Sequence, residues 1–74
     1  MQTNIQILDW KVDASAMIAE NEDYVVSLFD GADGDYDVAF IRPKAARHFA
    51  PAAQRAAMRE ARVAFTLAMR QQRS

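Results

Sequence analysis

The chain has 74 residues, no cysteine and a net charge of −1, and 26% of its residues are charged. This length allows one small domain (residues 1–74), and the missing cysteines exclude a disulfide framework and a thiolate metal site. No apolar run reaches the ~20 residues that cross a bilayer, and the first residues lack the pattern of a signal peptide, so we expect a soluble, cytoplasmic protein without membrane contact.

Residues 4–13 predict a strand in which the apolar alternation changes phase. Ile5 and Ile7 share one parity, whereas the apolar residues from Leu8 onward share the other. A bulge between Ile7 and Leu8 explains such a change, because a bulge reverses which side chains face inward. We expect Trp10 in or beside the core.

Residues 14–20 allow two interpretations, a short strand or a single helical turn. We favour the strand, because the turn-forming residues 21–23 then lead directly into the next strand.

The clearest β prediction is a hairpin of residues 24–29 and 36–41. The first segment is rich in β-branched and aromatic residues, and residues 30–35 between the two contain aspartates and two glycines, as turns often do. Alternation places Val38 and Phe40 on one face, and we expect both in the core.

The last segment predicts one long helix from Pro51 to Arg73. It is rich in alanine and other strong helix formers, and Pro51 suits a first helical position. We therefore expect an α+β fold, in which a small antiparallel sheet of three to four strands is covered on one face by the long C-terminal helix.

One face of this helix carries a ridge of basic residues. Their spacings of three and four residues, counted with Thr66, place them in one sector of the helix, and the ridge consists of Arg55, Arg59, Arg62, Arg70 and Arg73. Glu60 lies three or four residues from none of them, so the helix does not neutralise its own ridge. The ridge faces water, the acidic half of the chain or a partner, and the sequence leaves these alternatives open.

The opposite face of the helix is a narrow alanine stripe. A helix of 23 residues is about 34 Å long, whereas a six-residue strand spans about 20 Å, so we expect its last turns to overhang the sheet. The overhang predicts an apolar patch and a homodimer through residues 61–69. The expected contact residues are Ala61, Ala64, Leu67 and Ala68.

The charge is divided between the two halves of the chain. Residues 1–41 carry one lysine against nine acids, a net charge of −8, and residues 42–74 carry eight basic residues against Glu60, a net charge of +7. We interpret residues 1–42 as an acidic sheet region and residues 51–73 as a basic helix. Such asymmetry indicates neutralisation across the fold or two faces for different partners.

The sequence contains no recognisable catalytic set. Its one histidine, His48, lies in the connector between Arg47 and Phe49, and no glycine-rich phosphate loop is present. The aspartates near the two glycines do not follow the spacing of an EF-hand loop. We expect no enzyme, no cofactor and no metal.

Seven carboxylates offer a candidate protein-binding surface. Together they would present a phosphate-like array to a basic groove of another protein, and they are Glu20, Glu22, Asp23, Asp30, Asp33, Asp35 and Asp37. The alternative is that the arginine ridge binds nucleic-acid phosphates, because Arg suits bidentate phosphate contacts. However, aromatic residues are not interleaved with the arginines, and the pI of about 5.6 is low for a nucleic-acid binder.

A very short, cysteine-free, charge-polarised α+β chain with no catalytic set resembles small phage-borne inhibitors, among them the anti-CRISPR proteins. The resemblance is one of size and charge format. It implies a non-enzymatic protein that inhibits or regulates a nucleic-acid-handling complex, with its acids in the DNA groove of that complex or its arginines on the surface. A small nucleic-acid-binding module that uses the arginine ridge is the alternative function.

Overall fold

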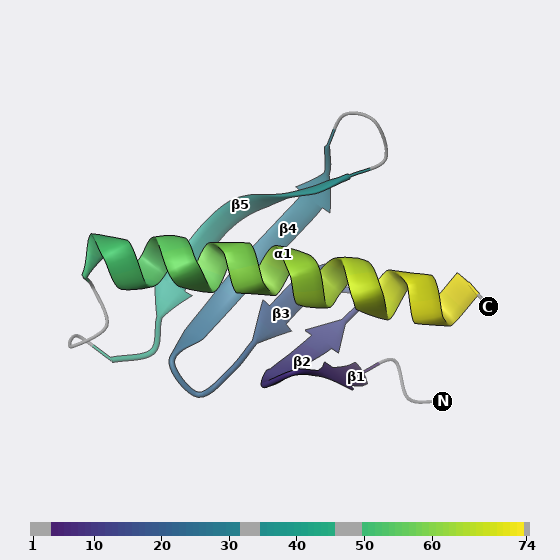
Figure 1. The fold of residues 1–74 in the computed structure, drawn as a ribbon, viewed down its shortest axis with the longest axis horizontal. Helices are drawn as coiled ribbons and strands as arrows, with labels where there is room; N and C mark the ends of the chain where they lie inside the picture. Colours follow the sequence, from purple (N-terminus) through teal and green to yellow (C-terminus); the bar gives the residue numbers. More distant parts are fainter. Residues whose placement is uncertain (1–3, 32–34, 46–49, 74) are drawn as a thin grey trace.

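The computed structural model describes residues 4–31, 35–45 and 50–73, which form five strands followed by one helix. The elements are β1 (Asn4–Ile7), β2 (Trp10–Asp13), β3 (Ile18–Glu20), β4 (Tyr24–Asp30), β5 (Tyr36–Pro43) and α1 (Pro51–Arg73). Each strand pairs antiparallel with the next one in the chain, so the order in the sheet is β1-β2-β3-β4-β5 (Figure 1). The predicted α+β fold is confirmed, with five strands in place of three to four.

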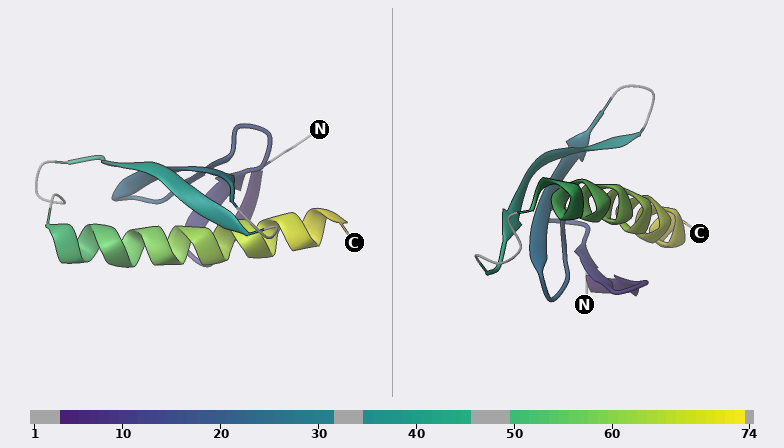
Figure 2. Two further views of the ribbon diagram at one scale, coloured as in Figure 1. Left: turned by 90° about the horizontal axis from the view of Figure 1, so that it is seen from above. Right: turned by 60° about the vertical axis from the view of Figure 1, so that its left-hand side comes forward.

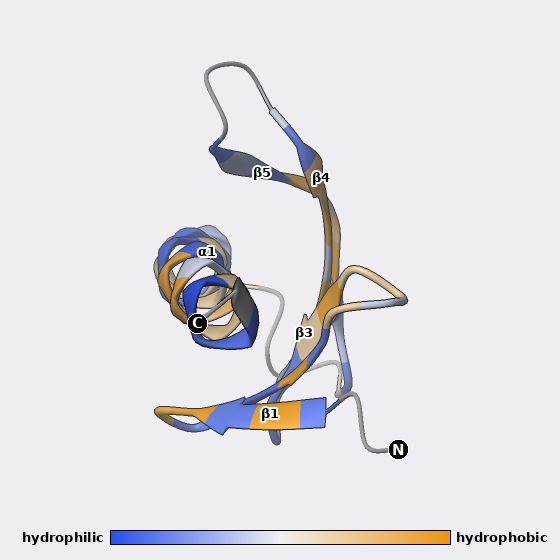
Figure 3. Ribbon diagram, turned by 90° about the vertical axis from the view of Figure 1, so that its right-hand side faces the viewer, coloured by the Kyte–Doolittle hydropathy of each residue, from blue (hydrophilic) through white to orange (hydrophobic). Residues whose placement is uncertain are grey.

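The sheet curves around the helix. Viewed along α1, the sheet has β1 at one end and the β4–β5 hairpin at the other, on opposite sides of the helix (Figure 3). The 23-residue helix extends over most of the 38 Å long axis of the molecule and runs past the sheet at its carboxyl end (Figure 2). Arg70 and the two glutamines that follow are exposed there, as expected for an overhanging turn. No helix among the described residues is both long and apolar enough to span a membrane.

The predicted single strand over residues 4–13, with its bulge, is wrong. Ile7 pairs with Trp10, so Leu8 and Asp9 form a two-residue turn between two antiparallel strands. Leu8 has a φ of 56°, in the left-handed region that such turns require and that leucine rarely adopts. The chain reverses at this turn, which places both Ile7 and Trp10 in the core and explains the change of phase in the sequence.

The favoured strand within residues 14–20 is confirmed only for β3, because residues 14–17 form a turn. Asp13 stabilises that turn through its carboxylate Oδ1, which accepts hydrogen bonds from Ser15 Oγ at 2.9 Å and from the backbone N–H of Ala16 at 3.2 Å.

The predicted hairpin is confirmed as β4 and β5, and Val38 packs against the core as expected, but Phe40 does not. Ser27 pairs with Phe40 and Leu28 pairs with Val38, so Ala39 is an extra residue and forms a bulge. The bulge changes the parity of the strand. Ile41 packs against the core in place of Phe40, which is 56% exposed, and the prediction of a core Phe40 is therefore wrong.

The helix covers the sheet through its alanine stripe. Small side chains let the backbone of α1 approach the sheet closely, and Phe65 fills the space at the edge of the stripe. Phe65 is fully buried, and its ring meets that of Tyr36 edge to face, with centroids 4.8 Å apart and planes at 71°. This contact joins the β4–β5 hairpin to the helix. The buried core comprises Ile7, Trp10, Val12, Ala19, Tyr24, Val26, Leu28, Tyr36, Ala57, Ala61, Ala64, Phe65 and Ala68.

Candidate functional site

The seven predicted acidic residues do not form one surface. Glu20, Glu22 and Asp23 lie at the turn between β3 and β4, whereas Asp30, Asp35 and Asp37 lie at the opposite end of β4, and Asp33 is outside the described residues. The seven residues of β4 separate the two groups by about 20 Å, at about 3.3 Å per residue. A single phosphate-like array across all seven is therefore not formed by the residues that the structure describes.

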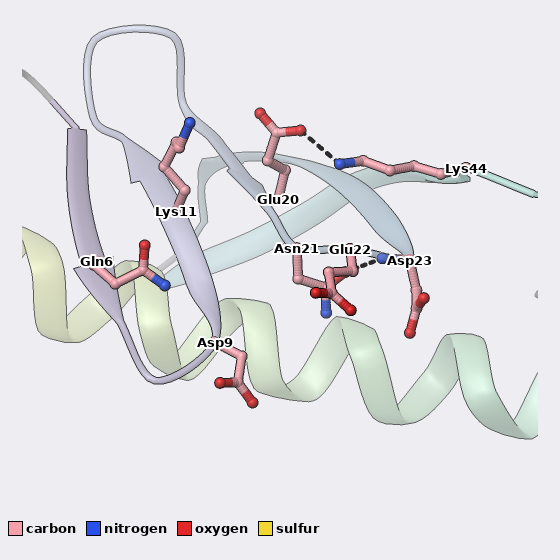
Figure 4. Close-up of a pocket in the computed structure, with 8 residues that line it drawn as sticks. All are labelled: Gln6, Asp9, Lys11, Glu20, Asn21, Glu22, Asp23 and Lys44. Atoms are coloured by element: carbon pink, nitrogen blue, oxygen red, sulfur yellow. Dashed lines mark hydrogen bonds and ion pairs between the residues drawn. The ribbon is translucent and has the colours of Figure 1, made fainter.

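The first acidic group lines a polar hollow of about 650 Å³ (Figure 4). Glu20 points toward Lys44, with Oε2 2.9 Å from Nζ, while Asp9 and Glu22 point away from that pair. The hydrogen bond and charge of Lys44 lower the pKa of the Glu20 carboxyl. The hollow is lined by Gln6, Asp9, Lys11, Glu20, Asn21, Glu22, Asp23 and Lys44.

Local hydrogen bonds explain the shape of this turn. Asn21 Oδ1 accepts the backbone N–H groups of Asp23 at 2.9 Å and Tyr24 at 2.8 Å, which is an Asx turn. The turn directs its carboxylates apart instead of onto one point. Within residues 4–31, 35–45 and 50–73, no group of three or more His, Cys, Asp or Glu side chains could hold a metal ion.

At the other end of β4, Asp37 contacts the helix. Arg62 Nη2 lies 3.5 Å from Asp37 Oδ1, and Arg62 Nε donates to the carbonyl oxygen of Tyr36 at 3.0 Å. Gly31 leaves room for this carboxylate, because a Cβ at Gly31 would lie 2.6 Å from Asp37 Oδ2. Arg62 and Asp37 thus join the hairpin to α1, and Asp37 is half-buried rather than fully exposed to a partner.

The arginine ridge borders hollows between α1 and this hairpin. The larger one, about 490 Å³, is here named the arginine groove and is lined by Phe29, Asp37, Val38, Arg55, Met58, Arg59 and Arg62. A smaller one, about 240 Å³, is lined by Asp35, Tyr36, Arg62, Val63, Thr66, Leu67 and Arg70. Arg62 contributes to both, so the two hollows adjoin along the helix.

The arginine groove combines positive charge with apolar surface. Arg55 and Arg59 are exposed, and no other described residue forms an ion pair or hydrogen bond with their side chains. Val38 and Met58 are half-buried, and the ring of Phe29 is 46% exposed. A guanidinium group can bind a carboxylate or a phosphate through two parallel hydrogen bonds. The groove can therefore bind an anionic group beside an apolar one.

Most of the predicted arginine ridge lies beside these two hollows. Four of the five predicted arginines line one of the two hollows, and the side chain of Arg73 is outside the described part. Aromatic residues are not interleaved with the arginines in the helix, but Phe29 of β4 lines the same groove. The alternation of β4, with Val26 and Leu28 inward, predicts that Phe29 is exposed but gives no signal that it lies beside the arginines.

The predicted dimer contacts also need correction. Ala61, Ala64 and Ala68 are fully buried in the monomer, because the curved sheet covers the alanine stripe. They are not available to a second copy. Leu67 is 38% exposed and Val63 is more exposed, so these two side chains are the apolar residues of this region that remain at the surface.

Comparisons of the chain with protein-family models, with characterised proteins and with solved structures find no match. The interpretation of the arginine groove therefore depends on its own residues and geometry.

Proposed function

We propose that this chain is a non-enzymatic interaction protein that binds an anionic segment of a larger protein through the arginine groove. The observation that supports this most directly is the pair Arg55 and Arg59, two exposed guanidinium groups beside an apolar floor. Phe, Met and Arg are enriched in protein–protein interfaces. That the partner is a nucleic-acid-handling complex rests on the resemblance to phage-borne inhibitors alone.

The groove is a better candidate than the acidic residues. Those residues are divided between two ends of the sheet, and Glu20 and Asp37 are each engaged with a basic residue of the same chain. Partner binding through them would first have to break these contacts. Arg55 and Arg59 form no ion pair or hydrogen bond with another described residue, so a partner that binds them has no such contact to break.

A nucleic acid is the second candidate. Phe29 favours it, because an aromatic ring beside arginines can stack with an exposed base. Asp35, an exposed carboxylate in the adjoining hollow, opposes it. A nucleic-acid strand carries a charge at every nucleotide, so a strand that continues along the helix brings a phosphate near this carboxylate, whereas a protein segment can place a neutral residue there.

The test compares two charge-matched double variants. Arg55→Glu/Arg59→Glu changes the groove, and Lys11→Glu/Arg42→Glu makes the same charge change at exposed positions of β2 and β5 that do not line it. Circular dichroism establishes that both variants fold. Each is then used for affinity capture from an extract of the producing cells, with quantitative mass spectrometry.

We expect the unmodified protein and the Lys11/Arg42 variant to capture the same proteins, and the Arg55/Arg59 variant to lose them. Equal capture by all three proteins would contradict the proposal. Fluorescence anisotropy with single-stranded and duplex oligonucleotides at rising salt tests the second candidate, since phosphate contacts weaken steeply with salt. Salt-sensitive binding that only the Arg55/Arg59 variant loses would assign the groove to nucleic acid.

A further inference from the structure

The spacing of the two groove arginines limits the form of the ligand. Arg55 and Arg59 are four residues apart in α1, so they lie on one face of the helix, about 6 Å apart along its axis. In an extended chain, residues i and i+2 point to the same side and are separated by about 6.6 Å. Two carboxylates at i and i+2 of an extended segment therefore match the two guanidinium groups in register.

The apolar side chains of the groove specify what lies between these carboxylates. In an extended segment, residue i+1 points to the side opposite i and i+2. With both carboxylates on Arg55 and Arg59, this side chain is directed away from α1, toward the hairpin side of the groove, where Phe29 and Val38 offer apolar surface. A large apolar side chain at i+1 therefore complements this apolar part of the groove best.

Arg62 and Asp37 are the other charged residues of the groove, and they determine its boundary and the charge that it offers to a ligand. Arg62 contacts Asp37 and the carbonyl oxygen of Tyr36 and lines both hollows, so it marks the boundary between them. With Asp37 opposed by Arg62, the charge offered to a ligand is that of Arg55 and Arg59. The volume of about 490 Å³ lies within the range of ~300–1,000 Å³ found for ligand pockets, enough for a short segment rather than a single ion.

We infer that the arginine groove recognises an extended protein segment of the form acid–large apolar–acid. Its carboxylates bind Arg55 and Arg59, and its central side chain packs on Phe29 and Val38. This inference rests on the proposed function of the groove and names the partner segment more closely. It makes Phe29 a specificity residue for the apolar side chain, separate from the arginines that bind charge.

Three fluorescein-labelled peptides test the inference, with flanks of Gly and Ser and the central sequences Asp-Phe-Asp, Asp-Ser-Asp and Ser-Phe-Ser. Binding is measured by fluorescence anisotropy against the unmodified protein, Phe29→Ala and Phe40→Ala. Phe40 is the matched control, because it is an exposed phenylalanine of the same hairpin that does not line the groove. Labelled oligothymidylate is the fourth probe.

We expect the Asp-Phe-Asp peptide to bind at least about tenfold more tightly than either of the other peptides, because it alone engages both parts of the groove. Phe29→Ala should remove most of the advantage over Asp-Ser-Asp, and Phe40→Ala should leave it unchanged. Equal binding of Asp-Phe-Asp and Asp-Ser-Asp, an advantage that survives Phe29→Ala, or the absence of peptide binding would each overturn the inference. Tighter binding of oligothymidylate, lost in Phe29→Ala, would also overturn it in favour of nucleic acid.

These outcomes separate the inference from the proposed function. If partner capture depends on Arg55 and Arg59 but the peptides show no preference for a central phenylalanine, the groove binds charge alone and only the inference fails. If capture does not depend on Arg55 and Arg59, the proposed function itself fails.

Discussion

Phe65 joins the helix to the β4–β5 hairpin, and its truncation tests that packing. The ring is fully buried and packs edge to face on Tyr36. Replacing a buried phenylalanine by alanine costs about 3–5 kcal/mol, from lost apolar contact and the cavity left behind. A chain of 74 residues is expected to have a free energy of unfolding of roughly 4–11 kcal/mol, so Phe65→Ala should remove a large part of it.

The measurement is urea unfolding followed by circular dichroism, with Val63→Ala as the control. Val63 lies on the same helix but its side chain is exposed, so its truncation should change the free energy of unfolding by less than about 0.5 kcal/mol. Because Phe65 holds Tyr36, Phe65→Ala should also loosen the hairpin and increase amide exchange in β5 more than in β2. A loss below about 1 kcal/mol, or one no larger than that of Val63→Ala, would refute the helix–hairpin packing.

Three further predictions follow from the structure. Leu8→Gly should raise the free energy of unfolding by about 0.5–1 kcal/mol, because glycine adopts the positive φ of this turn without strain and Leu8 is 67% exposed. A lower thermal midpoint for this variant would mean that the contacts of Leu8 stabilise the fold more than its backbone strain destabilises it. The Glu20–Lys44 pair should stabilise the fold above the ordinary glutamate pKa of about 4.3, with the contribution lost as the pH falls through the lowered pKa of Glu20. NMR titration of Lys44→Met should show the Glu20 pKa raised, and an unchanged value would exclude Lys44 as the cause. The homodimer remains a prediction, with Leu67 as its accessible residue, so Leu67→Glu should give a monomer, and light scattering that gives 8.3 kDa for the unmodified protein would contradict it.

Much of the fold could be predicted from the sequence because local signals are strong there. The alanine-rich segment without internal Gly or Pro predicts the helix from Pro51 to Arg73 at the bounds observed. The glycine-containing turn between two β-rich segments likewise predicts the hairpin of β4 and β5. The change of phase after Ile7 is also a real signal, but its cause is a two-residue turn rather than the bulge that we expect from the sequence. The turn at Leu8 and Asp9 contains neither Gly nor Asn, the residues that normally mark a two-residue hairpin.

The candidate site could not be assembled from the sequence, because its residues come from segments far apart in the chain. The helical period places Arg55, Arg59 and Arg62 on one ridge, and this was determined by the sequence alone. Only the tertiary structure decides what lies beside the ridge. The bend of the sheet around the helix brings Phe29 to the arginines, and Arg62 meets the carbonyl oxygen of a residue 26 positions away. Such contacts depend on sheet curvature and on the bulge at Ala39, which arise from packing over the whole core rather than from local preference.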